Sequence, residues 1–315
     1  MKSLIVYPKG GLANRLRALA SAQILAEYTG RKLFVNWVPA HKCNVEWEEL
    51  FVNRLEHSPF PLSSFQAGVN LYDDGDYTAG FYWDMPRLLI SNNSDVVAVH
   101  TCRNFQSMKM TQEEYKNAKS FFYKSLQPVS VIQKIVSDMR KEYFEKHDVV
   151  GIHIRRTDHL FFINKDPRLV CPIDQFIETM TGILKNNPRT KFFLATDDKN
   201  EETRIREIFK DAVIVYEKEN VCRNTRRGMQ DALIDWLLLS STSKIIGSYM
   251  SSFTEEAGSV NRIRTETIPK KEKSLALKRH FSQFKSKGLH NYFLYSYYYR
   301  KGQVIDWIVR NLRFK

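Results

Sequence analysis

Two adjacent arginines, Arg155 and Arg156, stand directly after an apolar run and are well placed to do chemistry. The run over 148–154 predicts a buried strand, so both arginines lie at its carboxyl end, where open α/β sheets bind ligands. Each guanidinium is a planar fork that keeps its charge and can pair with phosphate through two hydrogen bonds. The pair therefore predicts a pyrophosphate site that needs no metal. An ion-paired Arg-Arg at a strand end is the alternative.

A second strand end carries acids. Asp197 and Asp198 follow a strand predicted over 191–195. A carboxylate there can accept two hydrogen bonds from a guanine edge or from a ribose. Because Asp is also a preferred N-cap, the alternative is a cap for the helix predicted from residue 200.

One acid lies inside an apolar helix. The helix predicted over 225–240 places Asp231 and Asp235 on one face, and apolar residues surround Asp235. Burying a lone carboxylate is costly, so Asp235 must be paired or must serve a ligand. Arg226 and Arg227 are the candidate structural partners.

A glycine turn, Gly10-Gly11, separates a strand predicted over 2–7 from a helix predicted over 13–28. Such a turn lets a ligand approach the backbone and directs free N–H groups at an anion. A tight turn without a ligand is the alternative. We expect Arg17 of the helix to be solvated.

A hydroxyl-rich turn follows the strand predicted over 244–248. Ser251 and Ser252 open a further helix, and hydroxyls and free N–H groups at a helix start suit a phosphate. Glu255 and Glu256 follow them and can interact with the helix dipole.

These motifs resemble those of a known family. Residues 153–158, His-Ile-Arg-Arg-Thr-Asp, are similar to the His-x-Arg-Arg-x-Asp signature of the GDP-fucose-dependent fucosyltransferases, nearest to the α1,6-fucosyltransferases and the rhizobial nodulation enzymes. Segments 194–198, 235–240 and 251–256 follow in the family's order, and 10–17 resembles its amino-terminal loop. The resemblance implies an α/β fold of the GT-B type, with two Rossmann-like domains facing across a cleft. It implies a nucleotide-sugar site formed by Gly10, Gly11, Asn14, Arg15, His153, Asp158, Asp197, Asp198, Asp235, Ser251, Ser252 and Phe253.

The same resemblance implies a reaction. Fucose passes from GDP-fucose to a glycan hydroxyl with inversion and without a metal or other cofactor, and Arg155, helped by Arg156, stabilises the leaving phosphate. The loop after Asp158 is longer than in the α1,6 enzymes, and their loop glutamate has no counterpart here. Asp166 and His159 are therefore the candidate bases. The Asp235 segment is also similar to that of α1,2-fucosyltransferases, which leaves the linkage open. A GT-B enzyme using another nucleotide sugar is the main alternative.

Alternating strands and helices predict parallel sheets. We expect an N-terminal Rossmann-like domain over 1–145 on the acceptor side and a GDP-sugar-binding domain over 146–268. A basic, aromatic helical segment over 269–315 follows. Asp73-Asp74-Gly75-Asp76 is interpreted as a turn rather than a metal motif.

The net charge of +13 is uneven, because residues 270–315 hold 12 Lys and Arg against two acids. A basic terminal segment favours a local anionic surface over a nucleic-acid-binding protein, the least favoured alternative. Four scattered cysteines and the lack of a membrane-spanning run indicate a cytoplasmic protein. Cations and aromatics in 270–315 predict peripheral contact with an inner membrane face that carries a lipid-linked acceptor. Packing of that segment against the first domain is the alternative.

Overall fold

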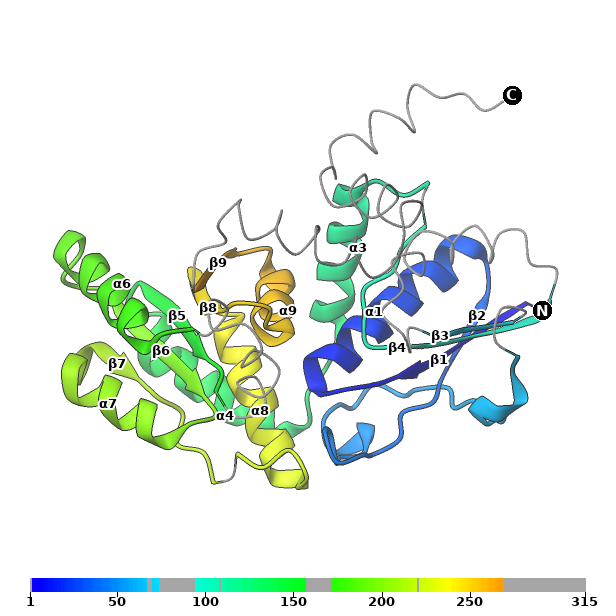
Figure 1. Ribbon diagram of the computed structural model, residues 1–315, viewed down its shortest axis with the longest axis horizontal. Helices are drawn as coiled ribbons and strands as arrows, with labels where there is room; N and C mark the ends of the chain where they lie inside the picture. Colours follow the sequence, from blue (N-terminus) through cyan, green and yellow to red (C-terminus); the bar gives the residue numbers. More distant parts are fainter. Residues whose placement is uncertain are drawn as a thin grey trace, which may run out of the picture.

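Two parallel β-sheets form the two halves of the molecule (Figure 1). The computed structural model describes residues 2–66, 70–73, 94–107, 109–156, 171–219 and 221–268. Within these ranges, no helix has the length and apolar character needed to cross a membrane.

The N-terminal sheet has the strand order β2-β1-β4-β3, and every pairing in it is parallel. Helix α1 connects β1 to β2 and stops at Gly30, which adopts the left-handed conformation that glycine tolerates. The elements are β1 (Ser3–Pro8), α1 (Leu12–Thr29), β2 (Lys32–Val35), β3 (Leu71–Asp73) and β4 (Val96–Thr101), with short 3-10 turns at Trp47–Glu49 and Leu62–Ser64.

The C-terminal sheet has the order β7-β6-β5-β8-β9 and is also parallel. Its central strand, β5, is buried along its whole length, which explains why its sequence is a continuous apolar run. The elements are β5 (Val149–Ile154), α6 (Ile173–Asn186), β6 (Lys191–Thr196), α7 (Lys199–Phe209), β7 (Val213–Ile214), α8 (Arg226–Leu239), β8 (Lys244–Ser248), α9 (Ser252–Asn261) and β9 (Arg264–Ile268), with a 3-10 turn at Lys210–Ala212.

Two helices link the sheets. Helix α3 (Gln112–Ser125) stands between the halves and packs against both α1 and α9 (Figure 1). Helix α4 (Ser130–Met139) packs against α8 and continues as a π-helical turn over Arg140–Phe144, so the hydrogen-bonding pattern of the helix changes after Met139. Apolar contacts cross the interface, as where Tyr123 meets Trp236 edge to face with ring centroids 5.4 Å apart.

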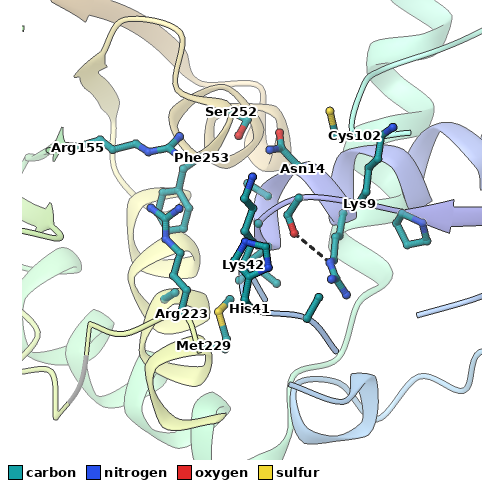
Figure 2. Close-up of a pocket in the computed structure, with 18 of the residues that line it drawn as sticks. Lys9, Asn14, His41, Lys42, Cys102, Arg155, Arg223, Met229, Ser252 and Phe253 are labelled. Carbon is teal, nitrogen blue, oxygen red and sulfur yellow. Dashed lines mark hydrogen bonds between the residues drawn. The ribbon is translucent and has the colours of Figure 1, made fainter. Parts of the chain in front are cut away.

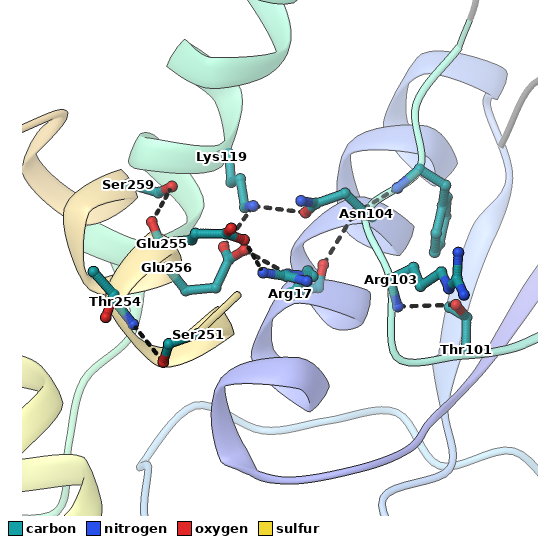
Figure 3. Close-up of polar contacts among 12 residues, drawn as sticks. Arg17, Thr101, Arg103, Asn104, Lys119, Ser251, Thr254, Glu255, Glu256 and Ser259 are labelled. Carbon is teal, nitrogen blue, oxygen red and sulfur yellow. Dashed lines mark hydrogen bonds and ion pairs between the residues drawn. The ribbon is translucent and has the colours of Figure 1, made fainter. Parts of the chain in front are cut away.

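A buried ionic cluster also joins the halves (Figure 3). Glu256 of α9 accepts from Arg17 of α1 at 2.6 Å and from Tyr123 of α3 at 2.6 Å, and it pairs with Lys119 at 2.5 Å. Arg17 also pairs with Glu255 at 2.6 Å. The expectation of a solvated Arg17 is therefore wrong, because α9 from the other half covers it with two carboxylates.

The predicted fold class is confirmed, including parallel sheets in both halves. Strands β3 and β9 were not predicted. Strand β9 lies at a sheet edge with a mostly polar sequence, so it lacks the apolar pattern that identifies a strand. The division into 1–145, 146–268 and 269–315 stays a prediction, and its last segment lies outside the described residues.

Candidate active site

A cavity of about 860 Å³ lies between the two halves, and residues from both line it. It sits at the carboxyl ends of the parallel strands, where Lys9 follows β1, Cys102 follows β4, Arg155 follows β5, Asp197 follows β6 and Tyr249 follows β8. In Figure 2, Arg155, Phe253 and Arg223 approach from one side, and Asn14 and Lys9 from the other. The volume is within the usual range for a small-molecule site.

The glycine turn forms the N-terminal wall. Gly10 has φ 88°, a left-handed conformation that favours glycine, and a Cβ there would lie 3.0 Å from Asn14 Nδ2. Gly11 is the N-cap residue of α1, so the turn and the start of the helix both face the cavity.

Arg15 supports this turn. Its Nε donates to the Gly10 carbonyl at 3.1 Å, and its Nη1 donates to the Val38 carbonyl at 2.6 Å. The guanidinium lies 5.2 Å from the ring centroid of Trp37, and burial lowers its pKa. Arg15 lines the cavity, but its hydrogen bonds to backbone carbonyls also give it a structural role.

The two arginines after β5 diverge. Arg155 lines the cavity, and its backbone N–H donates to Ser248. The Arg156 side chain is buried elsewhere, where it donates to the Cys171 carbonyl at 2.7 Å and pairs with Glu201 at 2.8 Å. Successive residues of an extended chain point to opposite sides, so the expectation that both guanidiniums face one anion is corrected to Arg155 alone.

The two aspartates after β6 also differ. Asp197 lines the cavity, accepts from the Arg156 backbone N–H at 2.7 Å, and lies 3.6 Å from the Arg223 guanidinium. Asp198 caps α7, accepting from the backbone N–H groups of residues 200 and 201 at 2.9 and 3.2 Å. Asp198 is not among the lining residues, so its nucleotide-binding assignment is corrected to the capping alternative.

His153 is 7% exposed and faces the cavity from the end of β5. Its Nδ1 lies 2.7 Å from Thr254 Oγ1 and 3.4 Å from Ser251 Oγ, and its ring stacks on Phe253 at 4.8 Å. Glycine at 247 allows this approach, since a Cβ there would lie 2.2 Å from Thr254 Oγ1. Ser252 and Phe253 line the cavity, whereas Ser251 is the N-cap residue of α9 and is not among the lining residues.

Asp235 lines the same wall and is 5% exposed. Its Oδ2 lies 3.1 Å from the ammonium of Lys218, a residue that sequence reasoning missed. Burial raises the pKa of Asp235 to about 6, although Lys218 acts to lower it. The candidate partners are occupied elsewhere, because Arg226 pairs with Glu49 and Arg227 with Asp231.

Lys218 and Arg223 had one usable sequence signal. Both lie in the loop after the short strand β7, and carboxyl strand ends mark ligand sites in such sheets. Basic residues of the N-terminal wall were also missed, and these are Lys9, His41, Lys42, His100 and Arg103. The predicted residues Asp158, His159 and Asp166 lie outside the described residues.

Two facing parallel sheets with a cavity between their carboxyl edges define the GT-B class of glycosyltransferase fold. Solved structures of fucosyltransferases share it. NodZ α-1,6-fucosyltransferase co-crystallised with GDP has a TM-score of 0.57 at 19% identity, covering 82% of this chain and 92% of that one. FUT1 of Arabidopsis thaliana, as a mutant in complex with GDP, has a TM-score of 0.59 at 15% identity, covering 86% of this chain and 71% of that one.

POFUT1 in complex with GDP has a TM-score of 0.53 at 12% identity, covering 85% of this chain and 99% of that one. No protein-family model and no curated protein matches the sequence. At these identities the likeness establishes the fold alone.

Proposed function

We propose that this protein is a glycosyltransferase that transfers fucose from GDP-fucose to a glycan hydroxyl, with inversion and without a metal. The observation that carries the proposal is the C-terminal wall of the cavity, which is lined by an incompletely hydrogen-bonded carboxylate, Asp235, and by a guanidinium, Arg155. A carboxylate suits the N1–H and N2–H donors of guanine, and a guanidinium suits a diphosphate. The three similar enzymes are described with GDP bound, which supports the same ligand here.

The proposal includes a position for each part of the donor. Guanine would lie against Asp235 and His153, and the diphosphate would extend toward Arg155 and the start of α9. Ser252 is the first residue of that helix, where backbone N–H groups have no partner within the helix. The fucose would then face the glycine turn across the cavity.

In the proposed step, the acceptor oxygen attacks C1 of fucose from the face opposite the phosphate. The bond between C1 and the β-phosphate oxygen breaks, the electron pair stays on GDP, and the acceptor proton goes to a base. Arg155 stabilises the charge that builds on the leaving phosphate. Asp166 and His159 stay the proposed bases.

Replacement of Arg155 by Gln tests the proposal. We expect transfer from GDP-fucose, measured as GDP release with a glycan library, to fall about 100-fold or more, because one preorganised charge contact is lost. Arg189→Gln, an exposed arginine in the same half, is the matched control. Near-normal turnover in Arg155→Gln would remove the proposal's central claim.

The preference for guanine, the identity of the donor sugar and the independence from metal need separate tests. GDP should bind more tightly than ADP or UDP, because only guanine supplies both donors to Asp235. The donor sugar follows from comparing GDP release from GDP-fucose and GDP-mannose, since another nucleotide sugar is the alternative. Full activity in EDTA is expected, and rescue by manganese after silencing by EDTA would contradict metal independence.

Peripheral attachment through 270–315, to a cytoplasmic membrane face bearing a lipid-linked glycan, is a further part of the proposal. Its support is the basic and aromatic composition of that segment. The full chain should co-sediment with anionic vesicles and not with neutral ones, and salt should weaken the binding. Equal behaviour with both vesicles would contradict it.

A further inference from the structure

The pair formed by Lys218 and Asp235 is buried but incompletely bonded. The two side chains are 7% and 8% exposed, and both residues line the cavity. Within the described part of the chain, neither Lys218 Nζ nor Asp235 Oδ1 has a hydrogen-bond partner, although the two charges lie 3.1 Å apart. Leaving buried polar groups in this state is unfavourable, so a ligand that bonds to both would be stabilised.

A neighbouring acid shows that the fold can satisfy a buried carboxylate. Asp231 lies one turn earlier on α8 and accepts from Tyr216 at 2.8 Å and from the Glu219 backbone N–H at 3.1 Å. Arg227 adds an ion pair at 3.2 Å. Asp231 does not line the cavity, whereas Asp235 does. The two residues whose polar atoms lack hydrogen-bond partners are therefore residues of the cavity wall.

We propose that Lys218 is a second base-reading residue, which donates to O6 of guanine while Asp235 accepts from N1–H and N2–H. This assignment rests on the proposed function and goes beyond it by dividing recognition of the base between two side chains. Guanine presents an acceptor beside two donors along one edge, and Lys218 beside Asp235 presents a donor beside an acceptor.

Adenine and uracil each mismatch the hydrogen-bonding pattern of Lys218 or of Asp235. Adenine carries an amino group at position 6, so its N–H would meet the ammonium of Lys218, donor against donor. Uracil offers an acceptor to Lys218 and one N–H to Asp235, but its second carbonyl would face the carboxylate. Recognition shared between Lys218 and Asp235 therefore disfavours adenine and uracil through one repulsive contact each.

The assignment can be isolated by changing the protein and the ligand together. In 6-thio-GDP, sulfur replaces O6 and accepts weakly, while both N–H donors remain; IDP keeps O6 and lacks the 2-amino group. Calorimetry on the full chain should give about tenfold or greater weakening for each analogue relative to GDP. In Lys218→Met, the GDP-to-6-thio-GDP difference should disappear and the GDP-to-IDP difference should remain.

Two other roles for Lys218 give different results. If Lys218 only neutralises Asp235, Lys218→Met would weaken GDP, 6-thio-GDP and IDP equally, and the proposal is overturned. If Lys218 binds phosphate, the variant would weaken GDP and leave guanosine unaffected, which also overturns it. The proposal requires guanosine and GDP to lose the same factor. Lys199→Met, at a lysine with a 71% exposed side chain, is the control.

The test does not depend on Lys218→Met alone. If that variant does not fold, Lys218→Gln replaces it, because glutamine keeps a hydrogen-bond donor. The main result is then the weaker binding of 6-thio-GDP than of GDP to the wild-type protein. Equal wild-type affinity for GDP and 6-thio-GDP overturns the assignment. If wild type does not bind GDP at all, the proposed function fails instead, so the two failures are distinguishable.

Discussion

Two buried carboxylates, Glu256 between the halves and Asp235 in the cavity wall, experience opposite environments. Both oxygens of Glu256 have partners: Arg17 and Lys119 form ion pairs with it (Figure 3), and Tyr123 donates a hydrogen bond to it. Asp235 has one cation beside one oxygen and leaves the other oxygen without a partner among the described residues. Burial acts to raise the pKa of both, but the two cations lower that of Glu256, whereas the pKa of Asp235 rises to about 6.

This difference distinguishes the structural charge of Glu256 from the charge of Asp235, which is proposed to bind a ligand. A fully bonded buried carboxylate fixes the packing of the groups around it, and here these come from α1, α3 and α9. An incompletely bonded one reduces stability and remains available to a ligand. The comparison therefore predicts that stability should depend on Glu256 and binding on Asp235.

The largest expected effect is on stability. Glu256→Gln leaves buried Lys119 without the carboxylate that it pairs with and leaves Arg17 with only the exposed carboxylate of Glu255, and we expect the free energy of unfolding to fall by about 3–5 kcal/mol. Urea denaturation measures this. Glu255→Gln is the matched control, since Glu255 is 55% exposed and should contribute less than about 1 kcal/mol. Equal losses in the two variants would contradict a structural role for the buried cluster.

For the Lys218–Asp235 pair in the cavity wall, we expect a large effect on GDP affinity and a small effect on stability. Replacing the pair by apolar residues, as Lys218→Met with Asp235→Leu, should leave the free energy of unfolding within about 1 kcal/mol or increase it, because two desolvated charges are removed. GDP affinity should fall about 100-fold or more, since every proposed base contact through these residues is lost. Calorimetry and urea denaturation on the same preparations check both parts. A stability loss as large as that of Glu256→Gln would show that the pair is structural.

The pH dependence should distinguish the same two sites. Asp235 accepts hydrogen bonds from guanine as a carboxylate, so guanosine affinity should fall as pH drops through about 6, approaching tenfold per pH unit. Guanosine is the ligand to use because it lacks phosphates that titrate in this range. Asp235→Asn removes the carboxylate and leaves His153 in place, so the fall in guanosine affinity below about pH 6 should disappear in this variant. An unchanged profile in Asp235→Asn would assign the titration elsewhere.

Stability should respond to pH with opposite signs at the two sites. The folded-state pKa of Asp235 is raised from 3.8 to about 6, so its contribution reduces stability as pH rises through that interval. The folded-state pKa of Glu256 is lowered, so its stabilisation is present above its ordinary pKa of 4.5 and is lost as pH falls through the folded value.

Sequence patterns predicted the helices and strands better than the ion pairs between distant residues. The strand predicted over 244–248 matches β8 residue for residue, because its apolar residues are buried in the sheet. Glu256 and Arg17 are 239 residues apart, and no local pattern connects them. The sequence therefore could not show that their charges meet.

The candidate site was predictable where it follows strand ends. Arg155, Asp197 and the Gly10 turn line the cavity because each follows a strand whose carboxyl end faces it. Sequence position could not show that Arg156 turns away, or that Lys218 supplies the partner for Asp235. Both depend on side-chain direction and on how a loop closes over α8.

The smallest expected effect concerns Asp198, a bonded carboxylate one residue from the cavity. Its side chain caps α7 through the backbone N–H groups of residues 200 and 201, so Asp198→Ala should lower the free energy of unfolding by about 1 kcal/mol. GDP affinity should stay within about twofold of wild type, because the side chain does not line the cavity. Asp198→Asn should be nearly neutral in urea denaturation, since Asn caps as well as Asp. A large loss of GDP affinity in both variants, without loss of stability, would mean that being bonded within the fold does not exclude a carboxylate here from ligand binding.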